Sequence, residues 1–306
     1  MSPPTEQTNL QRRAPADRED AERVAGLYAR VVGNGHVVLL LHAVPFNSRM
    51  WEPQFEALGG KARLIAPDLP GFGLSPVREV HSLSDYAEAV VDMLDRFGIA
   101  EVVVAGVSSG AYVAFDMIAP LGNRLKGLVI AGAVATPGAE QAPLDRHRLA
   151  AEIECGGSDA AAAKYLPKLL GWTTEREKPS LLRRLQEIVW ENSTVGVATA
   201  LRAIADRPDF SSILPEIRCP TLCIAGAEDP LTPPKLVRDM AERIPIAQIA
   251  IVPGAGHLVN LEAPEAFNRE LEKFLSEATS FSTPPGVDYN GNSRRDSDAT
   301  IRRRAE

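Results

Sequence analysis

A serine flanked by two glycines is the feature of this sequence best suited to chemistry. Ser108 follows the apolar run 102–107, with Gly106 two residues before it and Gly110 two residues after it. This G-x-S-x-G spacing is typical of a sharp strand-to-helix turn, where a Cβ at either glycine would collide across the turn. The turn lifts the hydroxyl above the sheet edge and aims the N–H groups of the next helix at the same place. The pattern predicts a nucleophile beside an anion stabiliser.

Two regular elements must position this serine. The run 101–107 predicts a strand, and 112–118 predicts a helix that Pro120 ends. The same residues are also compatible with a structural turn that has no chemical role. The rest of the chain has to decide between these two interpretations.

A serine hydroxyl is a weak nucleophile until a base removes its proton. Of the five histidines, His257 lies just after a predicted strand at 248–252 and inside a glycine-rich loop. The others lack that placement, so His257 is the predicted base. A carboxylate must then orient the imidazole, and both Glu228 and Asp229 follow a predicted strand at 221–225.

Two N–H donors are needed for the negative oxygen that forms during acyl transfer. The N–H of Ser109, at the start of the helix, is one candidate, and that of Val44, in the loop after the strand at 37–41, is the other. In the same loop, His42 and Phe46 are candidate pocket residues. For His42, a ring hydrogen-bonded to the backbone is favoured over an acid–base role.

The elements around these residues alternate between short apolar strands and helices. The alternation predicts an α/β fold whose mostly parallel sheet is flanked by helices, with the site at the carboxyl ends of the strands. Further strands are expected at 63–66 and 128–131, and further helices at 48–58, 84–97, 234–243 and 264–275.

The region 137–214 breaks this alternation. It contains helical patterns at 160–170, 181–190 and 194–204 and no convincing strand, so we expect a helical lid over the site. Trp172 and Trp190 in this lid are candidate pocket residues, although lid aromatics also pack as core. The α/β core then comprises 21–136 and 215–278, and the tails 1–20 and 279–306 are predicted to be disordered.

Composition narrows the possible partners. The chain has 306 residues, a net charge of −7 and a pI near 5.4. This negative net charge argues against nucleic acid or an anionic membrane as the binding partner and favours a small molecule. The three cysteines lack the spacing of a disulfide framework or a zinc site, so no metal is expected. Without a signal-peptide core or a membrane span, the protein is predicted to be cytoplasmic. Nothing in the sequence predicts an oligomeric state.

The motifs together resemble the α/β-hydrolase superfamily over about residues 25–278. The resemblance rests on 40–45, 66–75, the Ser108 turn, 226–229 and 256–257. It implies the chain order Ser108, Asp229, His257 and so favours Asp229 over Glu228. One departure is Ala43, where the family usually has glycine, from which we expect a slight loop adjustment. Ser108 separates the chain from the branches that place aspartate there.

Within the superfamily, the His-Ala-x-Pro motif is similar to that of enol-lactonase-like and carboxylesterase-like members. This resemblance implies a cofactor-independent serine hydrolase that cleaves an ester or lactone through an acyl-enzyme. C–C bond hydrolysis or perhydrolysis by the same triad stays open, as does a receptor-like binding protein with little turnover. A carboxylate-bearing enol-lactone would require a cation, for which the lid offers Arg146, Arg148, Arg183 and Arg184. Solvated charges on helix faces are the favoured interpretation for most of them.

Overall fold

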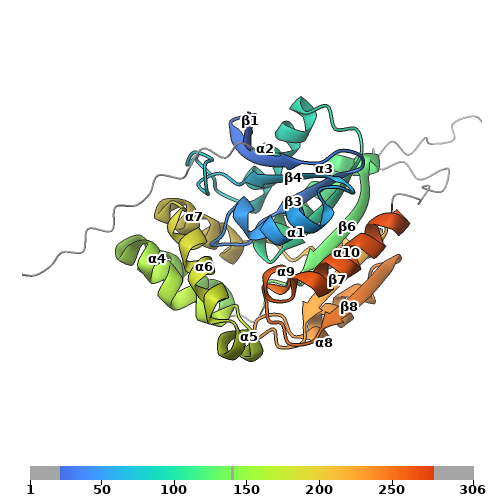
Figure 1. Cartoon of the computed structure of the whole chain (residues 1–306). Coiled ribbons are helices and arrows are strands. Elements are labelled where there is room, and N and C mark those ends of the chain that lie inside the picture. The colour runs from blue at the N-terminus through green and yellow to red at the C-terminus, as the bar shows by residue number, and fades with distance from the viewer. Residues whose placement is uncertain (1–20, 139–140, 279–306) are drawn as a thin grey trace, which may run out of the picture.

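One eight-stranded sheet organises the protein, whose computed structural model describes residues 21–138 and 141–278 (Figure 1). The strand order is β1-β2-β4-β3-β5-β6-β7-β8, and every neighbouring pair from β4 to β8 is parallel. The strands are β1 (Ala21–Val24), β2 (Leu27–Val32), β3 (Val37–Leu41), β4 (Arg63–Asp68), β5 (Val102–Val107), β6 (Leu125–Ala131), β7 (Thr221–Gly226) and β8 (Ala247–Val252).

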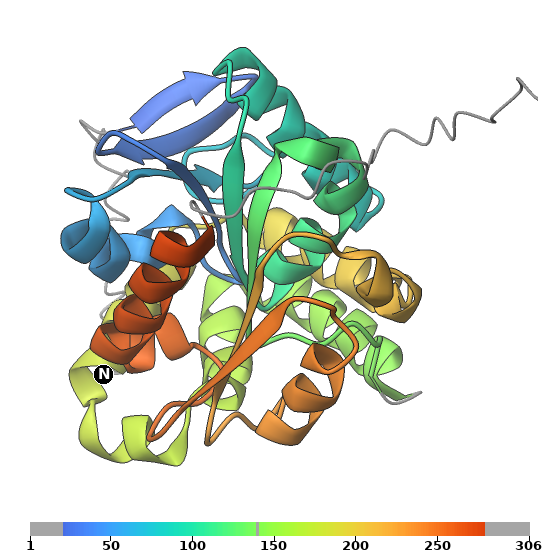
Figure 2. The same cartoon turned by 90° about the vertical axis from the view of Figure 1, so that its right-hand side faces the viewer.

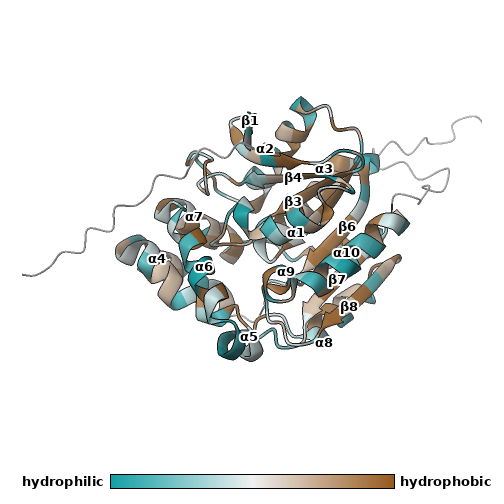
Figure 3. Ribbon diagram, viewed as in Figure 1, coloured by the Kyte–Doolittle hydropathy of each residue, from teal (hydrophilic) through white to brown (hydrophobic). Residues whose placement is uncertain are grey.

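The central strands are apolar because helices cover both faces of the sheet. All six residues of β5 are buried, and Figure 3 shows the hydrophobic colour concentrated in the strands. Helices α1 and α10 pack together on one side, as Figure 2 shows, whereas α2 and α3 pack together on the other. The core helices are η1 (Ser48–Trp51), α1 (Glu52–Leu58), α2 (Leu83–Arg96), α3 (Ser109–Leu121), η2 (Gly122–Arg124), α8 (Pro234–Ala241), α9 (Val259–Glu262) and α10 (Pro264–Ala278).

The predicted α/β-hydrolase fold is confirmed, and two local corrections apply to its core. The antiparallel strands β1 and β2 were not predicted, and their two-residue turn has positive φ at both Ala25 and Gly26, as a tight hairpin requires. Helix α3 also runs past Pro120 to Leu121 instead of ending before it. Pro120 is tolerated because it lies in the last turn, where its missing N–H removes a single helical hydrogen bond.

A layer of helices lies between β6 and β7 in the chain, and we call it the helical layer. In Figure 1 its main helices lie together at one side of the sheet. It contains α4 (Gln141–Tyr165), η3 (Leu166–Lys168), α5 (Trp172–Glu177), α6 (Pro179–Trp190), α7 (Thr194–Ala205), η4 (Phe210–Ser212) and η5 (Leu214–Glu216). Its action as a lid stays a prediction. The tails predicted to be disordered lie outside the described residues.

Candidate active site

Ser108 lies on the strained turn between β5 and α3. Its φ is 52° and its ψ −116°, a conformation that a non-glycine residue rarely adopts. A Cβ on Gly106 would lie 2.4 Å from the carbonyl carbon of Gly110, so that glycine permits the turn. A Cβ on Gly110 would lie 2.2 Å from the oxygen of Leu41, so the second glycine serves the approach to β3 and not, as predicted, clearance across the turn.

The structure brings together the three residues that the sequence places far apart. Nε2 of His257 lies 2.8 Å from Oγ of Ser108, and Nδ1 of His257 lies 2.9 Å from Oδ2 of Asp229. Asp229 follows β7 and His257 follows β8, so neighbouring parallel strands deliver both side chains to the edge at which β5 delivers the serine. All three are buried. This is the geometry of a nucleophile, a base and an orienting acid.

Asp229 is held as a carboxylate by four hydrogen bonds. Its Oδ1 accepts from the N–H groups of Leu231 and Thr232, and its Oδ2 accepts from the Thr232 hydroxyl at 2.6 Å and from His257. Burial raises the pKa of this carboxyl, but the attraction of His257 and these hydrogen bonds outweigh burial and lower the pKa to about 2. A fixed negative charge therefore faces the imidazole.

Thr232 was not predicted to belong to the site. Its Oγ lies 2.6 Å from Oδ2 of Asp229 and 3.4 Å from Nδ1 of His257. A threonine three residues after the acid carries no recognisable signal in the sequence, because the function of its hydroxyl depends on how the turn folds.

Glu228, the alternative acid, faces a different part of the molecule. Its carboxylate accepts from the backbone N–H of Thr173 at 2.8 Å and from the hydroxyl of Thr173 at 2.6 Å. This residue therefore connects the turn after β7 to α5 in the helical layer. The two adjacent carboxylates have different partners, and Asp229 is the one that contacts His257.

The two predicted oxyanion donors lie next to each other. The N–H of Val44 donates to Oγ of Ser109 at 2.8 Å, while Ser109 is the first residue of α3, where N–H groups have no partner within the helix. In this structure the Val44 N–H is therefore already hydrogen-bonded to the Ser109 hydroxyl. A substrate oxygen has to replace that hydroxyl to be bound by both N–H groups.

His42 and Phe46 are buried parts of the same loop, and both are fully shielded from solvent. Nε2 of His42 accepts from the N–H of Leu69 at 3.0 Å, and Nδ1 lies 3.2 Å from the oxygen of Ala43. Burial lowers the pKa of His42 to about 4 against the opposing attraction of Asp68. A neutral ring holding two backbone segments is the structural role favoured from the sequence.

The two candidate pocket tryptophans lie at the surface. Trp172 is 60% exposed and Trp190 is 45% exposed. The guanidinium of Arg176 lies over the ring of Trp172, 5.0 Å from its centroid. The structure therefore does not bring either indole into the buried cluster around Ser108.

The four candidate cations of the helical layer have different environments. Arg184 is paired with Glu52, and Arg148 and Arg183 are exposed. Arg146 is half-buried and donates to the oxygen of Pro137 at 3.4 Å. A cation that the sequence did not indicate is Arg207, which is buried, lies over the Tyr112 ring at 4.2 Å and donates to backbone oxygens.

Metal and membrane features were searched in the described part of the chain. Within 21–138 and 141–278, no group of three or more histidine, cysteine or acidic side chains is arranged to hold a metal ion. In the same residues no helix combines the length and the apolar character needed to cross a bilayer.

Known proteins share sequence and fold with this chain. Residues 38–270 match the family model described as "Alpha/beta hydrolase family". A putative carbamate hydrolase, RutD, of Caulobacter sp. is 28% identical over 83% of this chain and 97% of its own length. The 3-oxoadipate enol-lactonase 1 of Acinetobacter baylyi is 27% identical over 79% of this chain and 89% of its own.

A solved structure extends the comparison. A thermophilic esterase from Thermogutta terrifontis superposes with a TM-score of 0.80 and 30% identity, covering 84% of this chain and 98% of the esterase. The family match spans most of the sheet as well as the turns that carry Ser108, Asp229 and His257. This chain belongs to the α/β-hydrolase family.

Proposed function

We propose that this hydrolase cleaves a carboxylic ester or lactone through an acyl-enzyme on Ser108. The observation that carries the proposal is the continuous path from Oγ of Ser108 through His257 to Asp229, with separations of 2.8 and 2.9 Å. Both contacts are within the range expected between a nucleophile, its base and the group that orients the base.

In the first half of the reaction, Oγ of Ser108 attacks the carbonyl carbon while Nε2 of His257 takes the hydroxyl proton. Asp229 stabilises the imidazolium that forms. The carbonyl oxygen becomes negative and accepts from the N–H groups of Ser109 and Val44, which requires the Ser109 hydroxyl to turn away from Val44. His257 then gives its proton to the leaving alkoxide, and the C–O bond breaks.

In the second half, water replaces the alcohol. His257 removes a proton from this water as it attacks the acyl carbon, and the proton returns to Oγ of Ser108 when the acid is released. The matched relatives are described as a carbamate hydrolase, an enol-lactonase and an esterase. All three names denote hydrolysis at a carbonyl carbon, which supports this reaction class.

A fluorophosphonate probe tests the nucleophile without knowledge of the substrate. We expect the wild-type protein to be labelled on Ser108, the Ser108→Ala variant to remain unlabelled, and the Ser212→Ala variant, which changes an exposed serine of η4, to retain the label as a control. Absence of labelling in the wild-type protein would contradict an activated serine.

A panel of p-nitrophenyl esters of graded acyl length, together with simple lactones, tests the bond that is cleaved. The proposal expects release of p-nitrophenol or opening of a lactone that depends on Ser108. A protein that is labelled but turns over no member of the panel would instead favour C–C bond hydrolysis, perhydrolysis or a binding role.

A further inference from the structure

The loop that carries Val44 is fastened to the helical layer through one amide side chain. Asn192, in the turn after α6, is 5% exposed. Its Nδ2 donates to the backbone oxygen of Pro45 at 2.8 Å and to that of Ile188 at 2.9 Å. Its Oδ1 accepts from the N–H of Gly73 at 2.7 Å and from Nδ2 of Asn47 at 3.2 Å.

These four contacts use the full donor and acceptor capacity of the amide. Two of the partners are carbonyl oxygens that need a donor, and the other two are N–H groups that need an acceptor. A carboxylate of the same shape places an oxygen against the carbonyls, whereas alanine removes all four contacts. Position 192 therefore requires an amide, and a side chain that only fills the same space does not replace it.

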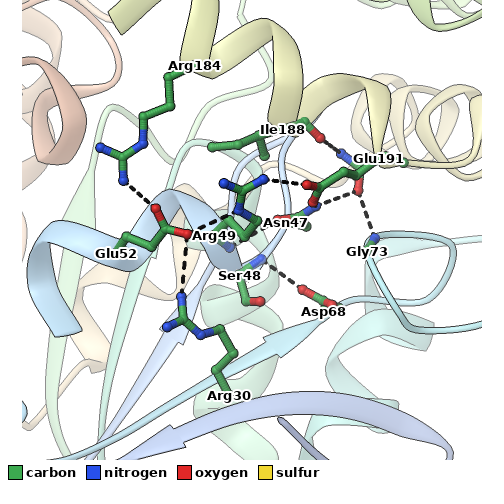
Figure 4. Close-up of polar contacts among 11 residues, drawn as sticks. Arg30, Asn47, Ser48, Arg49, Glu52, Asp68, Gly73, Arg184, Ile188 and Glu191 are labelled. Carbon is green, nitrogen blue, oxygen red and sulfur yellow. Dashed lines mark hydrogen bonds and ion pairs between the residues drawn. The ribbon is translucent and has the colours of Figure 1, made fainter. Parts of the chain in front are cut away.

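Charged groups hold the same two elements together around this amide. Figure 4 shows Arg49 facing Glu191 and Arg184 facing Glu52, which connect α6 and the turn after it with η1 and α1. Asn47 also donates to Glu191 at 3.1 Å. The helical layer is thus attached to the Val44 loop at several points, and Asn192 provides the contact to the Pro45 carbonyl.

Oxyanion stabilisation depends on the position of the donor. An N–H group contributes fully only when it lies about 2.7–3.1 Å from the developing negative oxygen. Val44 directly precedes Pro45, so the anchored Pro45 carbonyl limits how far the Val44 N–H can move. A direct anchor of the Val44 N–H is the Ser109 hydroxyl, which has to leave when substrate binds.

We propose that Asn192 is a positioning residue for catalysis: by holding the Pro45 carbonyl it keeps the Val44 N–H aimed at the oxyanion. The inference rests on the proposed function, because it assumes an acyl transfer on Ser108. It assigns the helical layer a part in the chemistry itself, in addition to any role in covering the site.

The test compares a p-nitrophenyl ester with the p-nitrophenyl thionoester of the same acid. A sulfur anion accepts N–H hydrogen bonds far more weakly than an oxygen anion, so only the ester depends strongly on the oxyanion donors. The variants are Asn192→Asp, which keeps the shape, and Asn192→Ala, which serves if the aspartate variant does not fold. Arg184→Met is the control, since it removes another link between the same elements.

For both Asn192 variants we expect kcat on the ester to fall by about 10- to 100-fold, less than the effect of deleting a donor outright. The thionoester rate should fall much less, and KM for the ester should change less than kcat. Arg184→Met should keep the wild-type ratio of ester to thionoester rates. An equal loss on both substrates, or no loss, overturns the inference.

Fluorophosphonate labelling separates this result from the parent proposal. A wild-type protein that is labelled on Ser108 but shows no change of ratio in the Asn192 variants contradicts the positioning role alone. A wild-type protein that is not labelled contradicts both. Circular dichroism and the thermal midpoint of each variant confirm that the rates refer to folded protein.

Discussion

At the scale of single residues, the adjacent carboxylates Asp229 and Glu228 offer a matched test of the triad. Asp229→Asn should lower kcat by about a thousandfold or more, because an amide favours the wrong imidazole tautomer and cannot stabilise the imidazolium. Glu228→Gln should lower kcat by less than about tenfold, because its carboxylate binds Thr173 and not His257. Steady-state kinetics of both variants measure kcat. A larger loss of kcat in the Glu228 variant than in the Asp229 variant contradicts the assignment of Asp229 as the orienting acid.

His42 leads to a prediction about stability and pH. Its pKa in the folded protein is lowered by burial to about 4, below the value of about 6.5 expected in the unfolded chain. The unfolded state therefore binds more protons between these two values, so the free energy of unfolding rises with pH through this window. The contribution, about 3 kcal/mol at most, is complete above pH 6.5 and is lost as pH falls towards 4.

Replacing the titrating ring tests this interpretation. His42→Gln removes the proton-binding group, so between pH 4 and 6.5 its free energy of unfolding should rise less steeply with pH than that of the wild-type protein. Urea unfolding at several pH values measures both slopes. Equal slopes in the two proteins would show that His42 contributes nothing to this pH dependence.

The sequence identified those site residues that directly follow a strand. Ser108, Asp229 and His257 come after β5, β7 and β8, and parallel strands deliver their carboxyl ends to one edge. Thr232 and Asn192 could not be found in the same way. A polar residue within a turn is common, and its partners become known only when segments as distant as 45 and 192 are placed together.

At the scale of elements, two glycines set how closely the helical layer approaches the core. Gly196 of α7 lies against Gly71 in the loop after β4, and a Cβ on Gly196 would lie 2.2 Å from the oxygen of Gly71. Gly196→Ala should lower the free energy of unfolding by about 1–3 kcal/mol through overpacking, despite the better helix propensity of alanine.

Gly60→Ala is the matched control for this prediction. A Cβ on Gly60 meets no atom within 4 Å, so the substitution should leave the urea midpoint within experimental scatter. A Gly196→Ala variant as stable as the control would show that the loop and α7 separate easily. In the Gly196→Ala variant, the contact of the added Cβ with Gly71 is also expected to disturb the nearby Gly73, whose N–H donates to Asn192.

The elements themselves differed in how well they could be predicted. The buried strands are continuous apolar runs, whose pattern is strong. The edge strand β1 is short, and its neighbour β2 is only half-buried beyond its first residues, so their pattern is weak. The helical pattern predicted at 160–170 begins in the second half of α4, whereas the helix itself begins at Gln141. Its first half was missed because charged residues are interspersed among its apolar ones, and a kink at Gly157, with φ 72°, separates the two halves.

At the scale of the whole molecule, the helical layer is connected to both halves of the sheet edge. The backbone N–H of His257 donates to the oxygen of Leu169 at 2.9 Å, and the N–H of Gly171 donates to the buried carboxylate of Glu262 at 2.8 Å. Asn192 binds the loops on the other side. Because the layer contacts the turns after β7 and β8 and the loop that carries Val44, its loss would expose buried polar groups on these segments.

We therefore expect the layer and the core to unfold together in one cooperative transition. Trp51 is fully buried in the core, whereas Trp172 and Trp190 belong to the layer and are partly exposed. A Trp172→Phe/Trp190→Phe variant leaves Trp51 as the fluorescent reporter, and Trp51→Phe leaves the two layer tryptophans. In each variant the urea midpoint from fluorescence should coincide with that from far-ultraviolet circular dichroism.

The comparison is made within each variant, so a loss of stability caused by the substitution does not affect it. If the layer tryptophans changed at lower urea than the circular dichroism signal, the layer would open before the core unfolds. Such an early transition would disconnect Asn192 from the Val44 loop while the triad was still folded. Loss of the proposed esterase activity in step with the layer signal, ahead of the core, would then reveal that the helical layer controls the proposed oxyanion donors through local unfolding instead of static support.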